Sequence, residues 1–285
     1  MKLVRFGAPG EEKTGVVVDE KILDTSSFGE GYDERFFASD GLKRLTAFVA
    51  ANQATLPVVP AGTRLGAPFA RPSKIVCVGL NYVKHAQETN APVPKEPILF
   101  MKSTTALAGP NDDVMIPKDA VKTDWEVELC VVIGKKASYV SEENAMEYVA
   151  GYCLHNDISE REFQLERGGT WDKGKGCDTF APMGPWMATK DEITDPHKLR
   201  LWLKLNDKML QDGNTDDLVF NIPQLVSYIS RFMTLLPGDV ITTGTPAGVA
   251  MGLKPPAYLQ PGDVMELGID GLGEQKQVLK AYAKN

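Results

Sequence analysis

The sequence predicts an α+β protein in which short strands outnumber helices. Many short apolar runs end at Gly, Pro or Asn-Asp turns, and the pair 201–205 and 208–211 has the pattern of a hairpin. Amphipathic helical spacing is confined to a few segments, among them 41–53 and 222–232. Hydrophobic residues make up 43% of the chain and charged residues 24%, which is typical of a folded globular protein.

The charge and composition of the chain exclude several classes of partner. The net charge is −7, the pI is near 5.2, and no block of Lys and Arg occurs. Nucleic acids and anionic membranes require a positive patch, so we expect neither as a partner. No charged-then-apolar leader is visible, and no apolar run approaches the ~20 residues that span a bilayer, so we expect a cytoplasmic protein. The cysteines form no CxxC pair, which fits reduced, structural thiols.

Residues 1–72 are predicted to form a small N-terminal domain with its linker. A β-meander comes first, with strands over residues 2–6, 15–18 and 21–24. A helix follows over residues 41–53, because its apolar residues recur on one face. Residues 56–72 are rich in Pro, Gly and Ala and lack periodicity, which indicates a linker. A second, larger domain is therefore expected over residues 73–285.

The second domain is predicted to alternate short strands with short helices. Strands are expected over residues 73–79, 97–102, 125–133, 152–156, 201–205 and 208–211, and within 237–245 and 261–267. Helices are expected over residues 82–89, 142–149 and 222–232, the first of them capped by Asn81. Residues 168–176 hold so many glycines that we predict a loop without regular structure, of the kind that carries function.

The strand over residues 125–133 carries two acidic residues on one face. Glu126 and Glu128 are two positions apart, and side chains two apart on a strand point the same way. Two carboxylates roughly 5–7 Å apart on an apolar strand repel each other and resist burial, which predicts a cation between them. A hard divalent metal such as Mg²⁺ takes carboxylate oxygens and keeps positions for water or substrate. The alternative is a strand with one solvated face, on which both residues meet water.

Asp157 ends the strand over residues 152–156 and would complete a three-carboxylate site with these glutamates. The alternative is that Asp157 only caps the short helix that follows. Arg161 and Gln164 follow at helical spacing, on the same face as Asp157. His155 alternates in the strand and is expected to lie in the core or behind the ligands.

Three further residues could carry acid–base or charge chemistry. His85 and Glu88 are three residues apart on one face of the helix over 82–89, and such a pair can move protons near neutral pH. The alternative is that both are solvated on the helix surface. Lys175 stands among glycines, where its ammonium can reach a bound anion, or it is a solvated loop lysine. Residues 242–246, Thr-Thr-Gly-Thr-Pro, suit a carboxylate or phosphate, or form an ordinary turn.

Taken in order, these segments resemble the motifs of the fumarylacetoacetate hydrolase family. The motifs are Gly79-Leu80-Asn81-Tyr82 with His85 and Glu88, Glu126-Val127-Glu128, Asp157 with Arg161 and Gln164, Lys175 with Thr179, and Thr243-Gly244-Thr245-Pro246. The resemblance covers about residue 73 to the C-terminus, and the set is highly specific. The opening residues 1–7 and the run 160–178 look closest to a bacterial subgroup. Its members are named ureidoglycolate lyases or 2,4-diketo-3-deoxy-sugar-acid hydrolases of the fuconate and rhamnonate pathways.

The resemblance implies a mixed β-sandwich roll that forms a homodimer, with a tetramer as the alternative. It implies Mg²⁺ or Mn²⁺ on three ligands: Glu126, Glu128 and Asp157. It also implies a catalytic set in which His85 and Glu88 activate water and Lys175 stabilises developing negative charge.

The resemblance also implies where a small 2-oxo acid substrate binds. Thr245 would hold the substrate carboxylate, with Gly244 and Tyr82 as further binding residues. Arg161 and Gln164 would bind polar groups at the far end of the substrate.

The expected reaction is metal-dependent C–C hydrolysis of a 2,4-diketo-3-deoxy sugar acid to pyruvate and a hydroxy acid such as lactate. Water would attack C4, the C3–C4 bond would break, and the metal would hold negative charge on the pyruvate enolate. A ureidoglycolate lyase that releases glyoxylate and urea is the alternative, and decarboxylation of oxaloacetate, acylpyruvate hydrolysis and isomerisation follow similar logic. A calcium-dependent binding module could use three acidic ligands, but it gives no reason for His85, Glu88 and Lys175 to converge.

Overall fold

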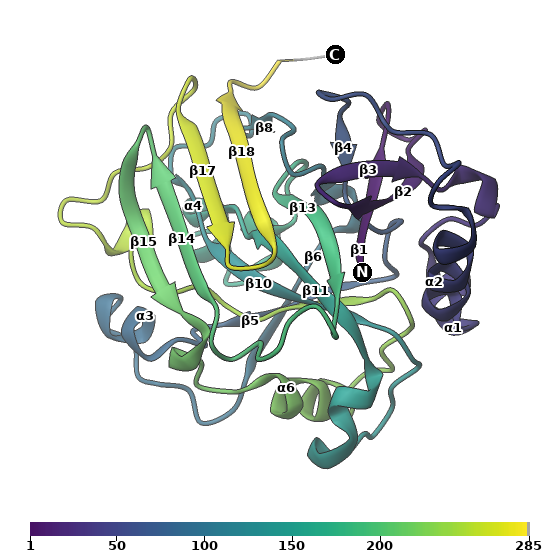
Figure 1. The fold of residues 1–285 in the computed structure, drawn as a ribbon. Coiled ribbons are helices and arrows are strands. Elements are labelled where there is room, and N and C mark those ends of the chain that lie inside the picture. The colour runs from purple at the N-terminus through teal and green to yellow at the C-terminus, as the bar shows by residue number, and fades with distance from the viewer. Residues whose placement is uncertain (284–285) are drawn as a thin grey trace.

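Two β-sheets that pack against each other form the body of the computed structural model, which describes residues 1–283 (Figure 1). The larger sheet has eleven strands, in the order β3 (Lys21–Asp24), β2 (Lys13–Val18), β1 (Lys2–Phe6), β13 (Ala181–Thr189), β11 (Val149–Asn156), β10 (Val127–Ile133), β16 (Val240–Thr242), β5 (Ile75–Gly79) and β6 (Ile98–Lys102), with β4 (Leu65–Gly66) beside β1 and β7 (Leu107–Ala108) beside β13. The second sheet has five strands, in the order β15 (Lys208–Asn214), β14 (Arg200–Leu205), β17 (Val264–Ile269), β18 (Gly273–Lys280) and β8 (Val114–Met115). The predicted α+β class with a mixed β-sandwich is confirmed.

Short helices and a two-stranded ladder complete the fold. The ladder joins β9 (Thr123–Asp124) to β12 (Ser159–Glu160). The α-helices are α1 (Glu34–Ala38), α2 (Gly41–Asn52), α3 (Val83–Glu88), α4 (Arg161–Leu165), α5 (Asp172–Lys175) and α6 (Ile222–Ile229). The 3₁₀ helices are η1 (Ser26–Phe28), η2 (Thr104–Ala106), η3 (Glu142–Tyr148), η4 (Thr215–Asp217) and η5 (Ala250–Gly252).

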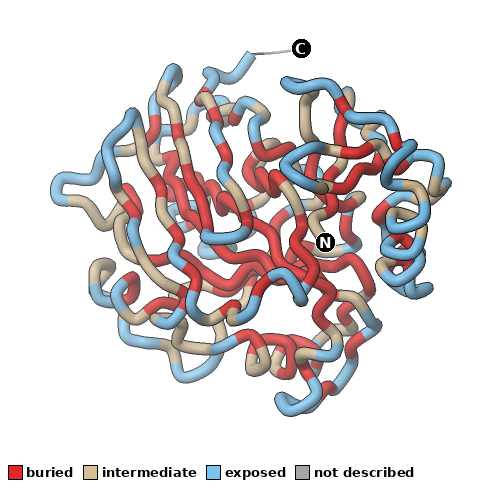
Figure 2. The backbone as a smooth tube through the Cα atoms, viewed as in Figure 1, coloured by how far each residue is buried: buried red, intermediate tan, exposed pale blue. Residues whose placement is uncertain are grey.

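The central strands of the larger sheet are buried along their whole length (Figure 2). Strands β14 and β17 of the second sheet pack on β10, and β18 packs on β11 and β13. A strand covered on both faces reads as a continuous apolar run, and this explains the Val- and Ile-rich sequence of β10. Glu126 and Glu128 are only 5% and 1% exposed, so the alternative of a solvated strand face is wrong.

The N-terminal meander is hydrogen-bonded into the larger sheet. Strands β1 and β3 begin and end where the sequence predicts, and β2 starts two residues earlier than expected. Lys2 and Leu3 pair with Ala188 and Met187 of β13, so the sheet continues across the boundary predicted at residue 72. Helices α1 and α2 lie beside this meander (Figure 1).

Several local expectations were wrong, and long-range contacts explain two of them. Asn81 does not cap α3, because its amide instead donates to the carbonyl oxygens of Phe220 and Thr243. The Gly-rich segment contains the single helical turn α5, where Gly174 packs so closely that a Cβ would lie 2.3 Å from Glu160 O. The segment expected to be a helix over 142–149 is the 3₁₀ helix η3. Strands β13 and β18 were not foreseen.

Across residues 1–283, every helix is too short or too polar to cross a lipid bilayer.

Candidate functional site

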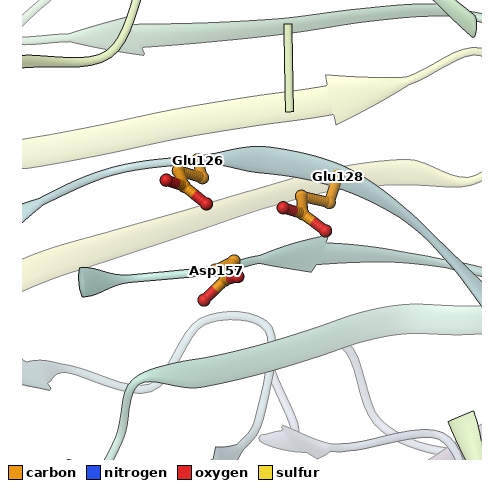
Figure 3. A group of neighbouring side chains, drawn as sticks. All are labelled: Glu126, Glu128 and Asp157. Carbon is orange, nitrogen blue, oxygen red and sulfur yellow. The ribbon is translucent and has the colours of Figure 1, made fainter. Parts of the chain in front are cut away.

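Three buried carboxylates meet where β10 begins and β11 ends (Figure 3). Glu126 directly precedes β10, Glu128 is its second residue, and Asp157 directly follows β11. The two strands are antiparallel neighbours, and the N–H of Asp157 donates to Glu126 O at 2.8 Å. One oxygen from each carboxylate lies within 4.8 Å of the others. The structure therefore brings together the three predicted metal ligands.

Two of these carboxylates already have cationic partners. Lys175 Nζ lies 2.8 Å from Glu126 Oε2 and 3.0 Å from Asp157 Oδ2. Arg161 Nη2 lies 2.6 Å from Glu126 Oε1. Burial opposes ionisation of Glu126, but Lys175 and then Arg161 outweigh it and hold the pKa of Glu126 below its ordinary value. For Asp157, burial is likewise outweighed, by Lys102 and then Lys175, and its pKa is lowered.

Glu128, the third carboxylate, has no such cationic partner among residues 1–283. Within residues 1–283, its carboxylate receives one hydrogen bond, from Gly244 N–H at 3.0 Å, and it has no ion pair. Burial, followed by the charges of Asp157 and Glu126, raises the pKa of Glu128 well above its ordinary value. Three converging oxygen donors, one of them short of a counter-charge, fit a hard divalent cation such as Mg²⁺ or Mn²⁺.

Lys102 is a functional-site residue that the sequence did not reveal. It is the last residue of β6, and its side chain is fully buried. Its Nζ donates to Asp157 Oδ1 at 2.5 Å and to Ile158 O at 2.9 Å. Asp157 is therefore held by a lysine on each oxygen, Lys102 on Oδ1 and Lys175 on Oδ2. A lysine at a strand end is ordinarily solvated, so no local signal marks it.

Replacing Lys102 with Met should lower the free energy of unfolding of the metal-free protein by ~3–5 kcal/mol, because it leaves a buried carboxylate with one cation. Urea unfolding in the presence of EDTA measures this. Lys74→Met is the control, since Asp239, the partner of Lys74, keeps three further donors from Ser73, Lys74 N–H and Leu236. Equal losses in the two variants would show that Lys102 has no special role at Asp157.

His85 and Glu88 form the predicted pair on α3. His85 Nδ1 lies 2.8 Å from Glu88 Oε1, and Glu88 Oε2 accepts a hydrogen bond from Gly248 N–H at 2.8 Å. Because an ionised carboxylate can only accept, this contact favours the tautomer of the neutral imidazole that carries its proton on Nδ1 and a lone pair on Nε2. Gly252 leaves room for this arrangement, since a Cβ there would lie 2.8 Å from Glu88 Cδ. Glu88 is thus held on both oxygens.

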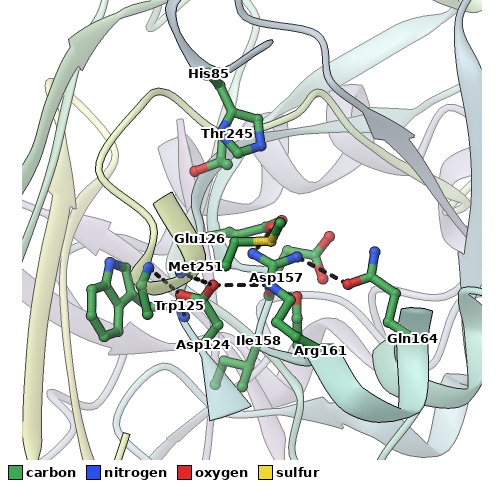
Figure 4. Close-up of polar contacts among 12 residues, drawn as sticks. His85, Asp124, Trp125, Glu126, Asp157, Ile158, Arg161, Gln164, Thr245 and Met251 are labelled. Atoms are coloured by element: carbon green, nitrogen blue, oxygen red, sulfur yellow. Dashed lines mark hydrogen bonds and ion pairs between the residues drawn. The ribbon is translucent and has the colours of Figure 1, made fainter. Parts of the chain in front are cut away.

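A pocket of about 210 Å³ joins these groups. Its polar lining comprises His85, Thr89, Glu126, Glu128, Arg161, Gln164, Lys175 and Thr245. Its apolar lining includes Leu80, Phe100, Leu165, Trp171 and Met251. Figure 4 shows His85 and Thr245 together on one side of Glu126, and Arg161 with Gln164 on the other. Glu88 and Asp157 lie behind the surface of the pocket, and His85 is the member of the pair that faces it.

The predicted substrate-binding residues are more engaged with the protein than expected. Arg161 donates to Asp124, Glu126 and Gln164, and it is 5% exposed. Burial opposes the charge of Arg161, but Asp124 and then Glu126 outweigh it and raise its pKa. Gln164 lines the pocket with its oxygen fixed on Arg161, which leaves its amide N–H groups for a ligand.

Within the segment 242–246, Thr245 lines the pocket and is also hydrogen-bonded to β10. The hydroxyl of Thr245 donates to Val127 O at 2.9 Å and accepts from Gln211 at 2.8 Å, so its hydrogen is not available to a substrate carboxylate. The N–H of Gly244 donates a hydrogen bond to Glu128. Gly244 has a positive φ of 97°, a backbone conformation that favours glycine. Tyr82 is fully buried and is not part of the pocket lining, and its hydroxyl has no partner within residues 1–283.

Comparison with known proteins places this site in a family. The sequence model of the fumarylacetoacetate (FAA) hydrolase C-terminal domain matches residues 74–280. A protein of Burkholderia multivorans is 53% identical over 283 residues, which is 99% of each chain. It carries the provisional name "hydrolase".

Solved structures of similar proteins include hydrolases and an isomerase. A fumarylacetoacetate hydrolase from Exiguobacterium antarcticum has a TM-score of 0.85 at 32% identity and covers 99% of this chain and 100% of its own. A maleylpyruvate hydrolase from Sphingobium sp. SYK-6, solved with manganese(II) and pyruvate, has a TM-score of 0.82 at 31% identity and the same coverage. A 2-hydroxyhepta-2,4-diene-1,7-dioate isomerase from Mycobacterium marinum has a TM-score of 0.77 at 31% identity and covers 100% of each chain. The chain therefore belongs to the fumarylacetoacetate hydrolase family of enzymes, as the motifs predict.

Proposed function

We propose that the protein is a Mg²⁺- or Mn²⁺-dependent hydrolase that cleaves a C–C bond in a 2,4-dioxo acid and releases pyruvate. Within this class, the proposed substrate is a 2,4-diketo-3-deoxy sugar acid derived from L-rhamnonate or L-fuconate, with a hydroxy acid such as lactate as the second product. The observation that carries the proposal is one pocket lined by His85 of an anchored His–Glu pair and by Glu126 and Glu128, which cluster with Asp157 directly behind them as a three-carboxylate metal site. The structural neighbour solved with manganese and pyruvate supports it.

A divalent metal on Glu126, Glu128 and Asp157 would supply Lewis-acid polarisation of substrate oxygens. His85 Nε2 takes a proton from the attacking water, while Glu88 holds the imidazole in the tautomer that leaves Nε2 unprotonated. Proton removal at this position turns water into a nucleophile for C4 of the substrate.

Charge and polar groups around the reacting bond have separate tasks. Lys175, whose pKa is raised by Asp157 and Glu126 despite its burial, stays charged and stabilises negative charge that develops on substrate oxygens. Gln164 presents its amide N–H groups to polar atoms of the substrate. Arg161 acts mainly by holding Glu126.

The same pocket could serve isomerisation, and the isomerase neighbour makes this the second candidate. Isomerisation needs proton transfer at carbon but no water, whereas hydrolysis consumes one water per turnover. Ureidoglycolate cleavage stays a further alternative because its substrate also chelates a metal through a carboxylate.

A substrate panel on metal-stripped enzyme tests the proposal. The panel comprises 2,4-diketo-3-deoxy-rhamnonate and -fuconate, ureidoglycolate, oxaloacetate and 2-hydroxyhepta-2,4-diene-1,7-dioate, each with and without Mg²⁺ or Mn²⁺. We expect metal-dependent pyruvate from a diketo sugar acid, at a kcat/KM far above that for oxaloacetate, and no turnover in EDTA. Glyoxylate from ureidoglycolate with the diketo acids untouched, or isomerisation without cleavage, would overturn the assignment.

A further inference from the structure

Asp124 lies next to the site, outside the pocket lining, and is the point at which several contacts of the site meet (Figure 4). It is the last residue of β9 and is fully buried. Its Oδ1 accepts from Ala250 N–H at 2.7 Å and from Trp125 N–H at 2.8 Å. Its Oδ2 accepts from Arg161 Nε at 2.9 Å and from Met251 N–H at 3.2 Å. One carboxylate thus receives four hydrogen bonds.

One set of these contacts leads to the metal ligand Glu126. Asp124 holds the Nε edge of Arg161, and the same guanidinium places Nη2 on Glu126 Oε1 at 2.6 Å. A guanidinium is planar and rigid, so fixing one edge fixes the direction of the others. Asp124 also supplies a negative charge to Arg161, which would otherwise depend more strongly on Glu126 and compete with a metal for it.

The other set leads to the His–Glu pair. The turn over residues 248–252 is bound at Ala250 and Met251 by Asp124, and at Gly248 O by Trp125 Nε1 at 3.0 Å. The same turn donates Gly248 N–H to Glu88 at 2.8 Å. The position of the Glu88 carboxylate therefore depends on a turn that residues 124 and 125 hold.

We propose that Asp124 is a positioning residue that fixes the His85–Glu88 pair and the carboxylate of Glu126 in one geometry. It reaches Glu126 through Arg161 and the pair through the 248–252 turn, and it lies outside the pocket lining. This inference rests on the proposed metal-dependent hydrolysis. It assigns to Asp124 a joint effect on metal affinity and turnover, which no residue with a purely local structural role would have.

The test is Asp124→Asn in the full-length protein. The Asn oxygen can still accept from Ala250 and Trp125, but its amide cannot accept from Arg161 Nε or Met251 N–H. We expect the Kd for Mn²⁺ to rise by roughly 10–100-fold and kcat to fall by roughly 10–100-fold. Calorimetric titration with Mn²⁺ measures the first, and pyruvate release from the best 2,4-dioxo acid measures the second.

Two variants separate the two routes. Trp125→Phe removes the indole hydrogen bond to Gly248, together with part of a fully buried side chain, and leaves all four hydrogen bonds to Asp124 in place, so kcat should fall while the Kd for Mn²⁺ stays within about twofold. In a Glu88→Gln background, Asp124→Asn should still weaken Mn²⁺ binding but should add little further loss of kcat, because the pair is already misoriented. If Asp124→Asn does not fold, Trp125→Phe still decides the route to the pair.

Asp239→Asn is the matched control. Asp239 is equally buried, accepts from two backbone N–H groups and pairs with Lys74, but it lies beside Ile133 at the opposite end of β10. It should lose stability without a change in the Kd for Mn²⁺ or in kcat. The positioning role is overturned if Asp124→Asn leaves both values within twofold, if Trp125→Phe leaves kcat unchanged, or if Asp239→Asn shifts both values as much. Wild-type protein that binds no metal or cleaves no dioxo acid would refute the proposed function instead.

Discussion

Glu88→Gln is expected to lower kcat by roughly 10²–10⁴-fold while leaving metal binding intact. In the native pair, Glu88 accepts from His85 Nδ1 through one oxygen and from Gly248 N–H through the other. Gln has one oxygen and cannot satisfy both. If its oxygen accepts from Gly248, its amide donates to His85 Nδ1, and the imidazole must carry its proton on Nε2. If the amide is reversed, it meets Gly248 N–H as a second donor. In either arrangement Nε2 is no longer a well-placed base.

Single-turnover kinetics and calorimetric titration with Mn²⁺ separate the possible roles of Glu88. The expected pattern is an unchanged Kd for Mn²⁺, a KM within a few-fold of wild type and a strongly reduced kcat. Gln87→Glu is the control, because Gln87 lies exposed on the same helix and should leave kcat within about twofold. Loss of Mn²⁺ binding in Glu88→Gln would make Glu88 a ligand, and an unchanged kcat would remove the pair from the mechanism.

The parts of this site that the sequence revealed are those fixed by local geometry. The shared face of Glu126 and Glu128 follows from the period of a strand, and the pairing of His85 with Glu88 follows from the period of a helix. These relations hold over a few residues and survive whatever tertiary structure surrounds them. Asp157 at a strand end and Lys175 among glycines were also candidates from the sequence, but each had an ordinary alternative, and the family resemblance implied their roles.

The parts that the sequence concealed depend on contacts between distant segments. Lys102 meets Asp157 across 55 residues, Asp124 meets Met251 across 127, and Glu88 meets Gly248 across 160. Each of these residues has an ordinary local explanation, such as a solvated strand end or a turn. Chain topology alone gives them their role, because it brings β6, β9 and the 248–252 turn together around the ends of β10 and β11.

The glycines of segment 168–176 were a misleading local signal, because close packing and not backbone freedom decides the structure there. The Gly-rich segment suggested a loop without regular structure, yet Gly174 sits within a helical turn against Glu160 and Gln164. A side chain at position 174 would overlap both neighbours, so glycine is required there for close packing rather than for freedom of the backbone. Lys175 is buried and fixed as a consequence.

Glu126→Gln and Glu128→Gln should both abolish metal binding but change the stability of the metal-free protein differently. Glu126 balances two buried cations, Arg161 and Lys175, and loss of its charge leaves them short of a partner. The free energy of unfolding in EDTA should therefore fall by ~3–5 kcal/mol. Glu128 has no cationic partner within residues 1–283, and Gln can still accept from Gly244 N–H. Its replacement should leave the free energy of unfolding unchanged or raise it by up to ~2 kcal/mol, because a buried carboxyl group near Asp157 is removed.

Urea unfolding with EDTA and with Mn²⁺ measures both effects in the same samples. Wild-type protein should gain ~2.7 kcal/mol at a Mn²⁺ concentration of one hundred times its Kd, and neither variant should gain it. The two substitutions are identical in chemistry and lie two residues apart, so each is the control for the other. Equal destabilisation in EDTA would mean that Glu128 has a counter-charge of its own, and an undiminished gain with Mn²⁺ in either variant would remove that residue from the ligand set. A neutral or stabilising Glu128→Gln that cannot bind metal would instead show that this carboxylate is kept for its ligand at a cost to the fold.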